Sequence, residues 1–273
     1  MCGTGDSMVK WLLALAVIVL VVVVISFGWG GGKGPALNVV GSTSVQPFAE
    51  MLAQAFEESH PGQVVDVQGG GSTAGLQAVR SNIADIGMCS RALKPDETQF
   101  EAVVIARDGL AVIVHPSNPI ANLTREQIRR LFSGAVANWR DVGGEGRTVR
   151  PITREEGSGT REAFVKMIMG GERISRKALT QESNGAVKEL VRNDPAAVGY
   201  MSLGLVGTEV KAVSVDGVPP TSENAATGRY PLIRPFLFVT RGRPSPRAQA
   251  FIDFVLSPQG QKMLQKEGLI GAK

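Results

Sequence analysis

The chain has 273 residues, of which 43% are hydrophobic and 20% charged, as expected for a globular protein with one large or two modest cores. The formal net charge is only +4, without a long run of lysine and arginine, and aromatic residues make up 5%. This argues against a nucleic-acid partner, because neither a basic surface nor a base-stacking platform is present. With only two cysteines and two histidines, we expect no disulfide framework, no metal site and no cofactor.

An unbroken apolar run, WLLALAVIVLVVVVISF, fills positions 11–27. It exceeds the usual hydrophobic core of a signal peptide and reaches the lower limit for a spanning helix. Lys10, directly before it, orients the N-terminus towards the cytoplasm. We therefore expect residues 1–34 to be a signal or anchor segment: a hydrophobic N-terminal helix and a Gly-rich linker. We slightly favour a retained transmembrane helix over a cleaved signal peptide. Both alternatives place the remaining chain outside the cytoplasm, in the periplasm or on the cell surface.

From position 36 onward, short β-branched runs alternate with segments of helical period. Strands are predicted at 37–40, 64–67 and 83–87. The helix after the first strand carries Phe48, Leu52 and Phe56 at four-residue spacing. This alternation predicts an α/β fold with a mostly parallel sheet and helices on both faces.

Two further segments, 109–114 and 236–239, have the sequence of continuous buried strands. Between them lies a second α/β block, with helices predicted near 125–131, 161–169 and 186–191. Helices at 249–256 and 259–266 follow. The simplest architecture inserts one lobe into the other and uses the two buried strands as crossover hinge strands. It predicts lobe 1 from 36–113 plus 236–273, and an inserted lobe 2 from 114–235.

Three loops share one pattern, in which a strand is followed by glycine, then hydroxyl residues, then a helix. They are GSTS at 41–44, GGGST at 69–73 and GSGT at 157–160. Backbone N–H groups at a helix start favour anions, and hydroxyls add donors without bulk. Each loop alone is explained by an ordinary N-cap. Three of them, two in one lobe and one in the other, favour a small tetrahedral oxyanion held in the cleft.

Arg154, at the end of a predicted strand and just before the third loop, is the predicted charged partner of the anion. Its guanidinium offers paired donors that match an oxyanion. The alternative is a solvated surface arginine. Nearby Glu156 either orients an arginine or is exposed.

The sequence resembles the phosphate-binding receptors of bacterial phosphate-specific ABC transporters, in a short-chain branch of the type II periplasmic-binding-protein superfamily. The resemblance extends from Leu37 to Lys273. It rests on GSTSVQPFAE at 41–50, VQGGGSTAGLQAV at 67–79, DIGMCSRALK at 85–94, ITREEGSGTREAF at 152–164, ESNGAVKELVRNDPAAVGYMSLG at 182–204, and the closing PFLFVTRG and LSPQGQ. It implies a two-lobed fold, binding of inorganic phosphate without catalysis, and delivery to ABC transporter permease subunits. We expect a monomer.

By position, the resemblance also implies the phosphate-binding residues. They are Thr43, Ser44, Ser72, Arg154, Ser158, Gly159 and Thr160. In longer members an aspartate follows the third strand and accepts the proton of hydrogen phosphate. This chain has Ser90 there, followed by Arg91, and we include both in the predicted site. The departure leaves open how sulfate, which carries no proton, is rejected.

Three alternatives remain. One is a receptor for another tetrahedral oxyanion, molybdate or sulfate. A membrane-anchored phosphate sensor fits an uncleaved helix but leaves the three loops unexplained. A phosphatase-like enzyme is disfavoured because the sequence has no Gly-x-Ser-x-Gly elbow, no acidic or histidine cluster and no GxxxxGK[ST] loop.

Overall fold

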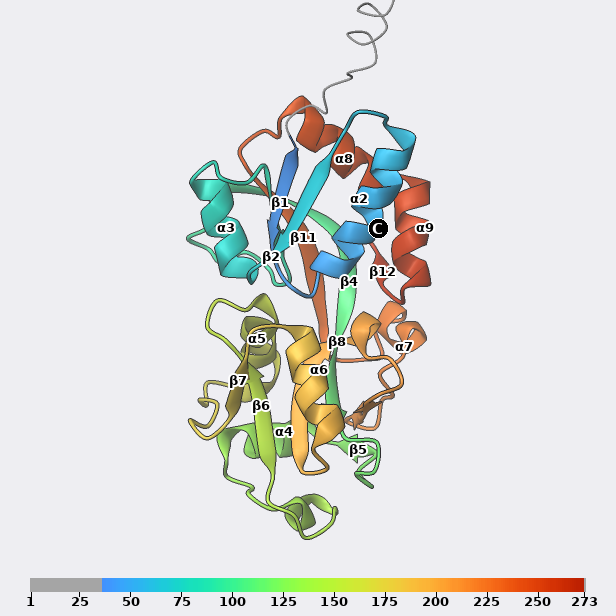
Figure 1. The fold of residues 1–273 in the computed structure, drawn as a ribbon. Helices are drawn as coiled ribbons and strands as arrows, with labels where there is room; N and C mark the ends of the chain where they lie inside the picture. The colour runs from blue at the N-terminus through green and yellow to red at the C-terminus, as the bar shows by residue number, and fades with distance from the viewer. Residues whose placement is uncertain (1–35, 273) are drawn as a thin grey trace, which may run out of the picture.

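The computed structural model describes residues 36–272. The chain forms two α/β lobes, one above the other, joined by the long strands β4 (Phe100–Val114) and β11 (Ile233–Arg241) (Figure 1). The predicted two-lobed α/β fold is therefore confirmed. The predicted hydrophobic helix and linker lie outside the described residues. Between residues 36 and 272, none of the helices has the length and apolar character needed to cross a membrane.

Lobe 1 holds the N-terminal and C-terminal parts of the described chain (Figure 1). Strand β1 lies between β2 and β3 and is parallel to both, whereas β11 is antiparallel to β3. The predicted apolar stripe of the first helix is buried, and Phe56 packs edge-on against Phe251 at 5.3 Å between ring centroids. The elements of lobe 1 are β1 (Leu37–Gly41), α2 (Gln46–Ser59), β2 (Val65–Gly69), α3 (Ser72–Arg80), β3 (Ile86–Cys89), α8 (Pro246–Leu256), α9 (Pro258–Lys266) and β12 (Ile270–Gly271).

Lobe 2 is built on the second half of β4, which pairs antiparallel with β8; β8 in turn pairs parallel with β6. Its core includes the stacked rings of Phe164 and Tyr200, with centroids 4.0 Å apart. Its elements are β5 (Asn122–Leu123), α4 (Arg125–Ser133), η1 (Trp139–Val142), β6 (Arg150–Arg154), α5 (Gly159–Phe164), η2 (Val165–Met169), β7 (Leu179–Gln181), α6 (Asn184–Asn193), β8 (Ala197–Ser202), η3 (Leu203–Leu205), β9 (Lys211–Ala212), β10 (Ser214–Val215) and α7 (Ser222–Ala226).

Two strand predictions need correction. The third strand begins at Ile86, and Ile83, predicted to start it, is 70% exposed. The reason is that the chain first closes helix α3: Asn82 has a left-handed φ of 54°, and the amide of Ile83 bonds back to the Ala78 carbonyl. Strand β4 begins at Phe100 instead of 109. The first half of this strand was not predicted because charged residues such as Glu101 and Arg107 interrupt the apolar pattern.

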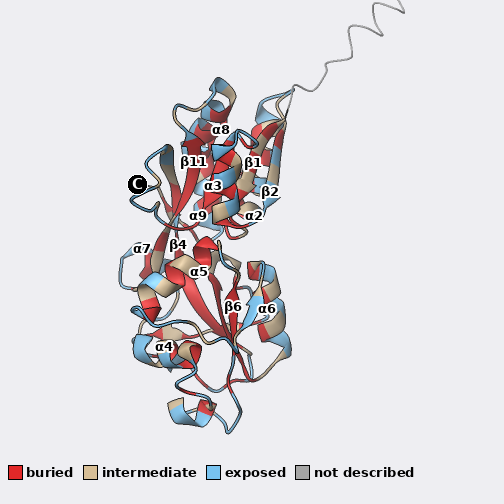
Figure 2. Cartoon of the chain, turned by 90° about the vertical axis from the view of Figure 1, so that its left-hand side faces the viewer, coloured by how far each residue is buried: buried red, intermediate tan, exposed pale blue. Residues whose placement is uncertain are grey.

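The two long strands contribute to both hydrophobic cores. Ala106 and Phe236 pack in the core of lobe 1, whereas Leu110 lies in the core of lobe 2 and Ile233 packs against it. The change occurs at Asp108 and Arg234, which are opposite each other in the antiparallel register. Asp108 and Arg234 are themselves buried, although Arg107, next to Asp108 on β4, is exposed (Figure 2 shows burial along the chain).

Candidate anion site

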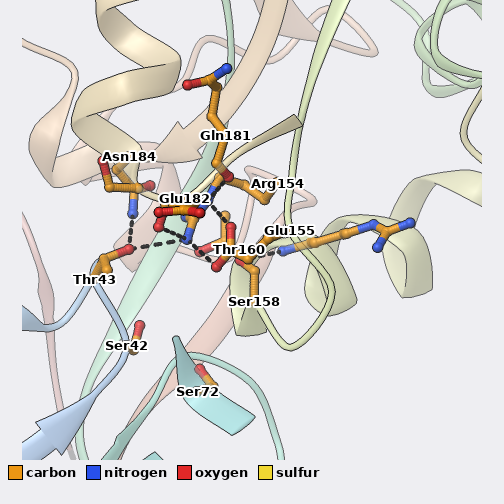
Figure 3. A network of polar contacts seen from close by, with 12 residues as sticks. Ser42, Thr43, Ser72, Arg154, Glu155, Ser158, Thr160, Gln181, Glu182 and Asn184 are labelled. Atoms are coloured by element: carbon orange, nitrogen blue, oxygen red, sulfur yellow. Dashed lines mark hydrogen bonds and ion pairs between the residues drawn. The ribbon is translucent and has the colours of Figure 1, made fainter. Parts of the chain in front are cut away.

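The three predicted loops meet between the lobes (Figure 3). The loops after β1 and before α3 belong to lobe 1, and the loop before α5 belongs to lobe 2. Backbone contact joins them, because the Thr73 N–H donates to the Gly157 carbonyl at 3.0 Å. The lobes are therefore in direct contact at the predicted site.

Only one of the three loops uses its hydroxyl as an ordinary helix cap. Ser158 Oγ accepts from the Arg161 N–H at 3.3 Å, whereas α2 and α3 have no side-chain cap. Ser44 Oγ instead lies 2.7 Å from Thr160 Oγ1 across the two lobes. Ser72 Oγ accepts from the Ser90 N–H at 3.1 Å. The hydroxyls of the first two loops thus link segments that are distant in sequence.

Glycine at position 159 allows the loops to approach. A Cβ there would lie 2.2 Å from Ser72 Oγ and 2.7 Å from Ser90 Oγ, closer than a real Cβ comes to such atoms. Gly41 has a φ of 144° and a similar restriction, with Met88 O 2.3 Å from its would-be Cβ. Side chains larger than hydrogen at either position would force the segments apart.

Arg154 is 1% exposed at the end of β6. Its Nη2 donates to Thr43 Oγ1 at 3.1 Å, and Nε and Nη2 donate to the Glu155 carboxylate at 2.9 Å. The carbonyls of Gln181 and Glu182 accept further bonds. Its Nη1, although buried, has no hydrogen-bond partner among residues 36–272. A buried donor of this kind costs free energy until an acceptor reaches it.

The acidic partner of Arg154 is Glu155, and of the two alternatives for Glu156 the structure shows the exposed one. Figure 3 shows the Glu155 carboxylate beside the guanidinium. The Glu156 side chain is 92% exposed and pairs with Arg161 at 3.3 Å. Glu155 therefore fixes the orientation of Arg154 and balances its charge.

Ser90 and Arg91 separate in the structure. Ser90 is fully buried, with its Oγ 3.4 Å from Ser72 Oγ. The Arg91 guanidinium pairs with Glu97 at 2.8 Å and with Glu162 of lobe 2 at 3.1 Å. The structure therefore groups Ser90 with the loop hydroxyls and directs the guanidinium of Arg91 to carboxylates.

Three buried residues at the site escaped the sequence-based prediction. Asn184, the first residue of α6, donates through Nδ2 to Ser44 Oγ at 2.9 Å. Arg234 donates through Nη1 to Thr160 Oγ1 at 2.7 Å, and its Nη2 lies 2.8 Å from Asp108 Oδ2. Burial raises the pKa of Asp108 and lowers the pKa of Arg234, while the ion pair between them opposes both shifts. The available signal was a pair of opposite charges, each lying just before one of the two predicted buried strands.

A groove of about 730 Å³ borders the site. Thr43 and Glu155 line it, and Glu155 also holds Arg154. Backbone and side chains from both lobes complete the lining: Gly69, Gly70, Thr180, Gln181, Glu182, Ser183 and Ala186. The groove gives a small polar ligand an approach to the loops.

Known proteins match nearly the whole described chain. Residues 30–259 match the family model described as PBP superfamily domain. The chain is 31% identical to the phosphate-binding protein PstS of Bacillus subtilis, over 84% of this chain and 78% of that protein. PstS of Pseudomonas aeruginosa is 30% identical, with 86% and 82% covered.

Comparison with solved structures points to the same family. A Clostridium perfringens protein, described as a phosphate ABC transporter substrate-binding protein and crystallised with bound phosphate, is 37% identical with a TM-score of 0.85, covering 88% of this chain and all of that one. An ABC-type phosphate transport receptor from Vibrio cholerae is also 37% identical, with a TM-score of 0.73 and coverages of 86% and 99%. The chain therefore belongs to the PBP superfamily and, within it, to the family of PstS phosphate-binding proteins.

Proposed function

We propose that this chain binds inorganic phosphate between its lobes and delivers it to the permease subunits of an ABC importer, without catalysing a reaction. The observation that carries the proposal is the buried Nη1 of Arg154, which lacks a partner among the described residues and lies in the guanidinium that Thr43 also contacts. An oxyanion oxygen supplies the acceptor that this donor needs. The names of the relatives from B. subtilis and C. perfringens support phosphate as that oxyanion.

The proposed contacts combine this guanidinium with neutral donors from both lobes. They are Thr43, Ser44, Ser72, Ser90, Arg154, Ser158, Gly159 and Thr160. Because Glu155 balances the charge of Arg154 and Asp108 balances that of Arg234, we propose that hydrogen bonds, more than net charge, hold the anion. For Arg91, which pairs with Glu97 and Glu162, we propose a role in holding the lobes together.

The proposal includes the arrangement of the chain in the cell. We propose a monomer that acts outside the cytoplasm, in the periplasm or at the cell surface, attached by its N-terminal segment. Protein recovered from the soluble extracytoplasmic fraction with an N-terminus near Trp29 would show a cleaved signal peptide instead.

We also propose the division into lobe 1 and an inserted lobe 2, and place the crossing at Asp108 and Arg234, where the two strands pass from the core of one lobe to the core of the other.

Calorimetry on the full-length chain in mild detergent tests the function. We expect saturable binding of phosphate with one site, and weaker binding of sulfate and molybdate. Tighter binding of molybdate or sulfate would support a receptor for that oxyanion instead. Radioactive phosphate should be released unchanged on dialysis, and hydrolysis of a phosphate ester by the pure protein would contradict a receptor without catalysis.

A further inference from the structure

Six buried residues form a closed ring of hydrogen bonds between the site and the two long strands. Around the ring they are Ser44, Thr160, Arg234, Asp108, Ser202 and Asn184. Asp108 Oδ1 accepts from Ser202 Oγ at 2.9 Å, and the Ser202 N–H donates to Asn184 Oδ1 at 3.1 Å. Asn184 Nδ2 donates to Ser44 Oγ, Ser44 Oγ meets Thr160 Oγ1, and Arg234 bonds Thr160 and Asp108.

The ring fixes the direction of its hydrogen bonds except for the one between Ser44 and Thr160, in which either hydroxyl can donate. A guanidinium can only donate, so Thr160 Oγ1 accepts from Arg234. The Asn184 amide is oriented by the Ser202 N–H, so its Nδ2 donates to Ser44 Oγ. Each of the two hydroxyls has therefore accepted one bond and retains one hydrogen to donate. Since the two oxygens share one hydrogen at 2.7 Å, the hydrogen of the other hydroxyl is available for a third acceptor.

Arg234 acts on the site through Thr160. Its Nε and Nη2 both donate to Asp108 Oδ2, at 3.0 and 2.8 Å, and Nη1 donates to Thr160 and more weakly to the Ser90 carbonyl at 3.5 Å. These protein acceptors fix the guanidinium, and Phe236 supports it with its ring centroid 5.2 Å from Cζ. This arrangement is that of a positioning residue, in contrast to Arg154, whose Nη1 has no partner in the described chain.

The ring also contains a lobe boundary. Ser44 belongs to the loop after β1 in lobe 1, whereas its two neighbours in the ring, Thr160 and Asn184, lie in the first turns of helices of lobe 2. Separation of the lobes would break the two bonds that Ser44 makes. It would leave Thr160 bonded to Arg234, which is held by Asp108 directly opposite on β4. Thr160 would then keep its orientation in an open form.

We propose that Arg234 is a positioning residue for the anion: it donates to Thr160 Oγ1 and so directs the hydroxyl hydrogen of Thr160 to the bound oxyanion, and when the lobes meet Ser44 donates to Thr160. This inference rests on the proposed function, since it assigns Thr160 to the bound anion. It adds the hinge strands to the binding apparatus, because Asp108 on β4 and Arg234 on β11 together set the direction of a hydroxyl in lobe 2.

A double-mutant cycle tests the proposal on the full-length chain, with phosphate as ligand. One change replaces the ion pair as a unit, by Asp108→Asn with Arg234→Gln, so that no charge is left buried alone. The other is Thr160→Val, which removes the hydroxyl but keeps the shape. In the Thr160 background we expect loss of the pair to raise the Kd for phosphate at least about tenfold, the scale of one hydrogen bond to a charged acceptor. In the Thr160→Val background the same loss should change Kd less than about threefold.

A purely structural role predicts a different result, namely the same fold-change in both backgrounds, and that outcome would overturn the proposal. A Kd within about threefold of wild type after loss of the pair would overturn it as well. Thr160→Ser, which restores a hydroxyl, should restore the dependence on Arg234. Titration followed by ³¹P NMR extends the measurement to weak variants.

Two controls keep the test decisive. If the paired replacement does not fold by circular dichroism, Arg234→Lys takes its place, because it keeps a cation beside Asp108 but lacks the planar fork that reaches Thr160 as well. The same coupling with Thr160 is expected, and equal losses in both backgrounds would again contradict the proposal. The wild-type titration decides the proposed function by itself; if another oxyanion binds in place of phosphate, the cycle is performed with that anion.

Discussion

The hydroxyl oxygens of Ser44 and Thr160 lie 2.7 Å apart, although the two residues are separated by 116 positions and belong to different lobes. Each residue lies in a segment in which glycine precedes hydroxyl residues and a helix. Asn184 donates a hydrogen bond to Ser44, and Arg234 donates one to Thr160, so other protein groups hold both hydroxyls of this contact between the lobes. It follows that local changes at these loops should affect closure and affinity together.

Arg154→Ala should weaken phosphate binding by roughly 30-fold to several thousandfold. Truncation of one partner of a buried, hydrogen-bonded charge pair typically costs about 2–5 kcal/mol, and about 1.4 kcal/mol is tenfold. Calorimetry measures the loss. Arg229→Ala, at an exposed arginine paired with Glu223, is the matched control and should leave Kd unchanged. A folded Arg154→Ala protein that binds within about threefold of wild type would remove Arg154 from the site.

Gly159→Ala should impair closure without unfolding lobe 2. The new Cβ would lie 2.2 Å from Ser72 Oγ, and overpacking of this kind costs about 1–3 kcal/mol, or about 5- to 150-fold in affinity. Small-angle scattering with phosphate should show a larger radius of gyration than wild type. Gly185→Ala is the control, because its Cβ would only meet Ser183 Oγ at 3.8 Å. Equal affinities of wild type and Gly159→Ala would mean that the loops do not close on each other in solution.

Glu162→Gln should slightly increase the population of the form in which the lobes are apart. Glu162 of lobe 2 pairs with Arg91 at 3.1 Å and with Lys94 at 2.7 Å, both in lobe 1. The pairs are partly exposed, so we expect a loss of about 0.5–1 kcal/mol, or about two- to fivefold in phosphate affinity, and a weaker dependence of affinity on salt. Glu189→Gln, whose partner Arg192 is in the same helix, should have no such effect. An unchanged salt dependence for Glu162→Gln would contradict this role.

Stability should respond to pH through Glu97. Hydrogen bonds from Arg91 lower the pKa of the Glu97 carboxyl, so the folded state favours its ionised form. This contribution is fully present above the pKa in the unfolded chain, about 4.3, and is lost as the pH falls through the lower folded value. Glu97→Gln should reduce the free energy of unfolding by about 1–2 kcal/mol at pH 7.

The difference between Glu97→Gln and wild type should disappear in acid, when the wild-type carboxyl is protonated. Urea unfolding at several pH values measures it. Glu101→Gln, at an exposed position of β4, is the control. A constant difference between Glu97→Gln and wild type from pH 7 down to pH 2 would show that ionisation of Glu97 is not the cause.

The sequence by itself determined the α/β class and the positions of the three loops in which glycine precedes hydroxyl residues and a helix. Both are local properties: alternation of apolar residues sets strands and helices, and glycine before hydroxyl residues at a helix start is visible in a few consecutive positions. Arg154 was predicted as a site residue for the same reason, from its place at the end of a strand shortly before the third loop. The start of β3 was missed because the left-handed Asn82 prolongs the closing turn of α3.

The tertiary structure alone decided which groups meet. In the sequence, Asp108 and Arg234 are charges just before two separate predicted strands, and only the antiparallel register of β4 and β11 places them opposite each other. Likewise, the choice of Glu155 over Glu156 as partner of Arg154 depends on the turn of the chain after β6. Contacts of this kind are formed between residues distant in sequence, and no local pattern specifies the packing that brings them within hydrogen-bond distance.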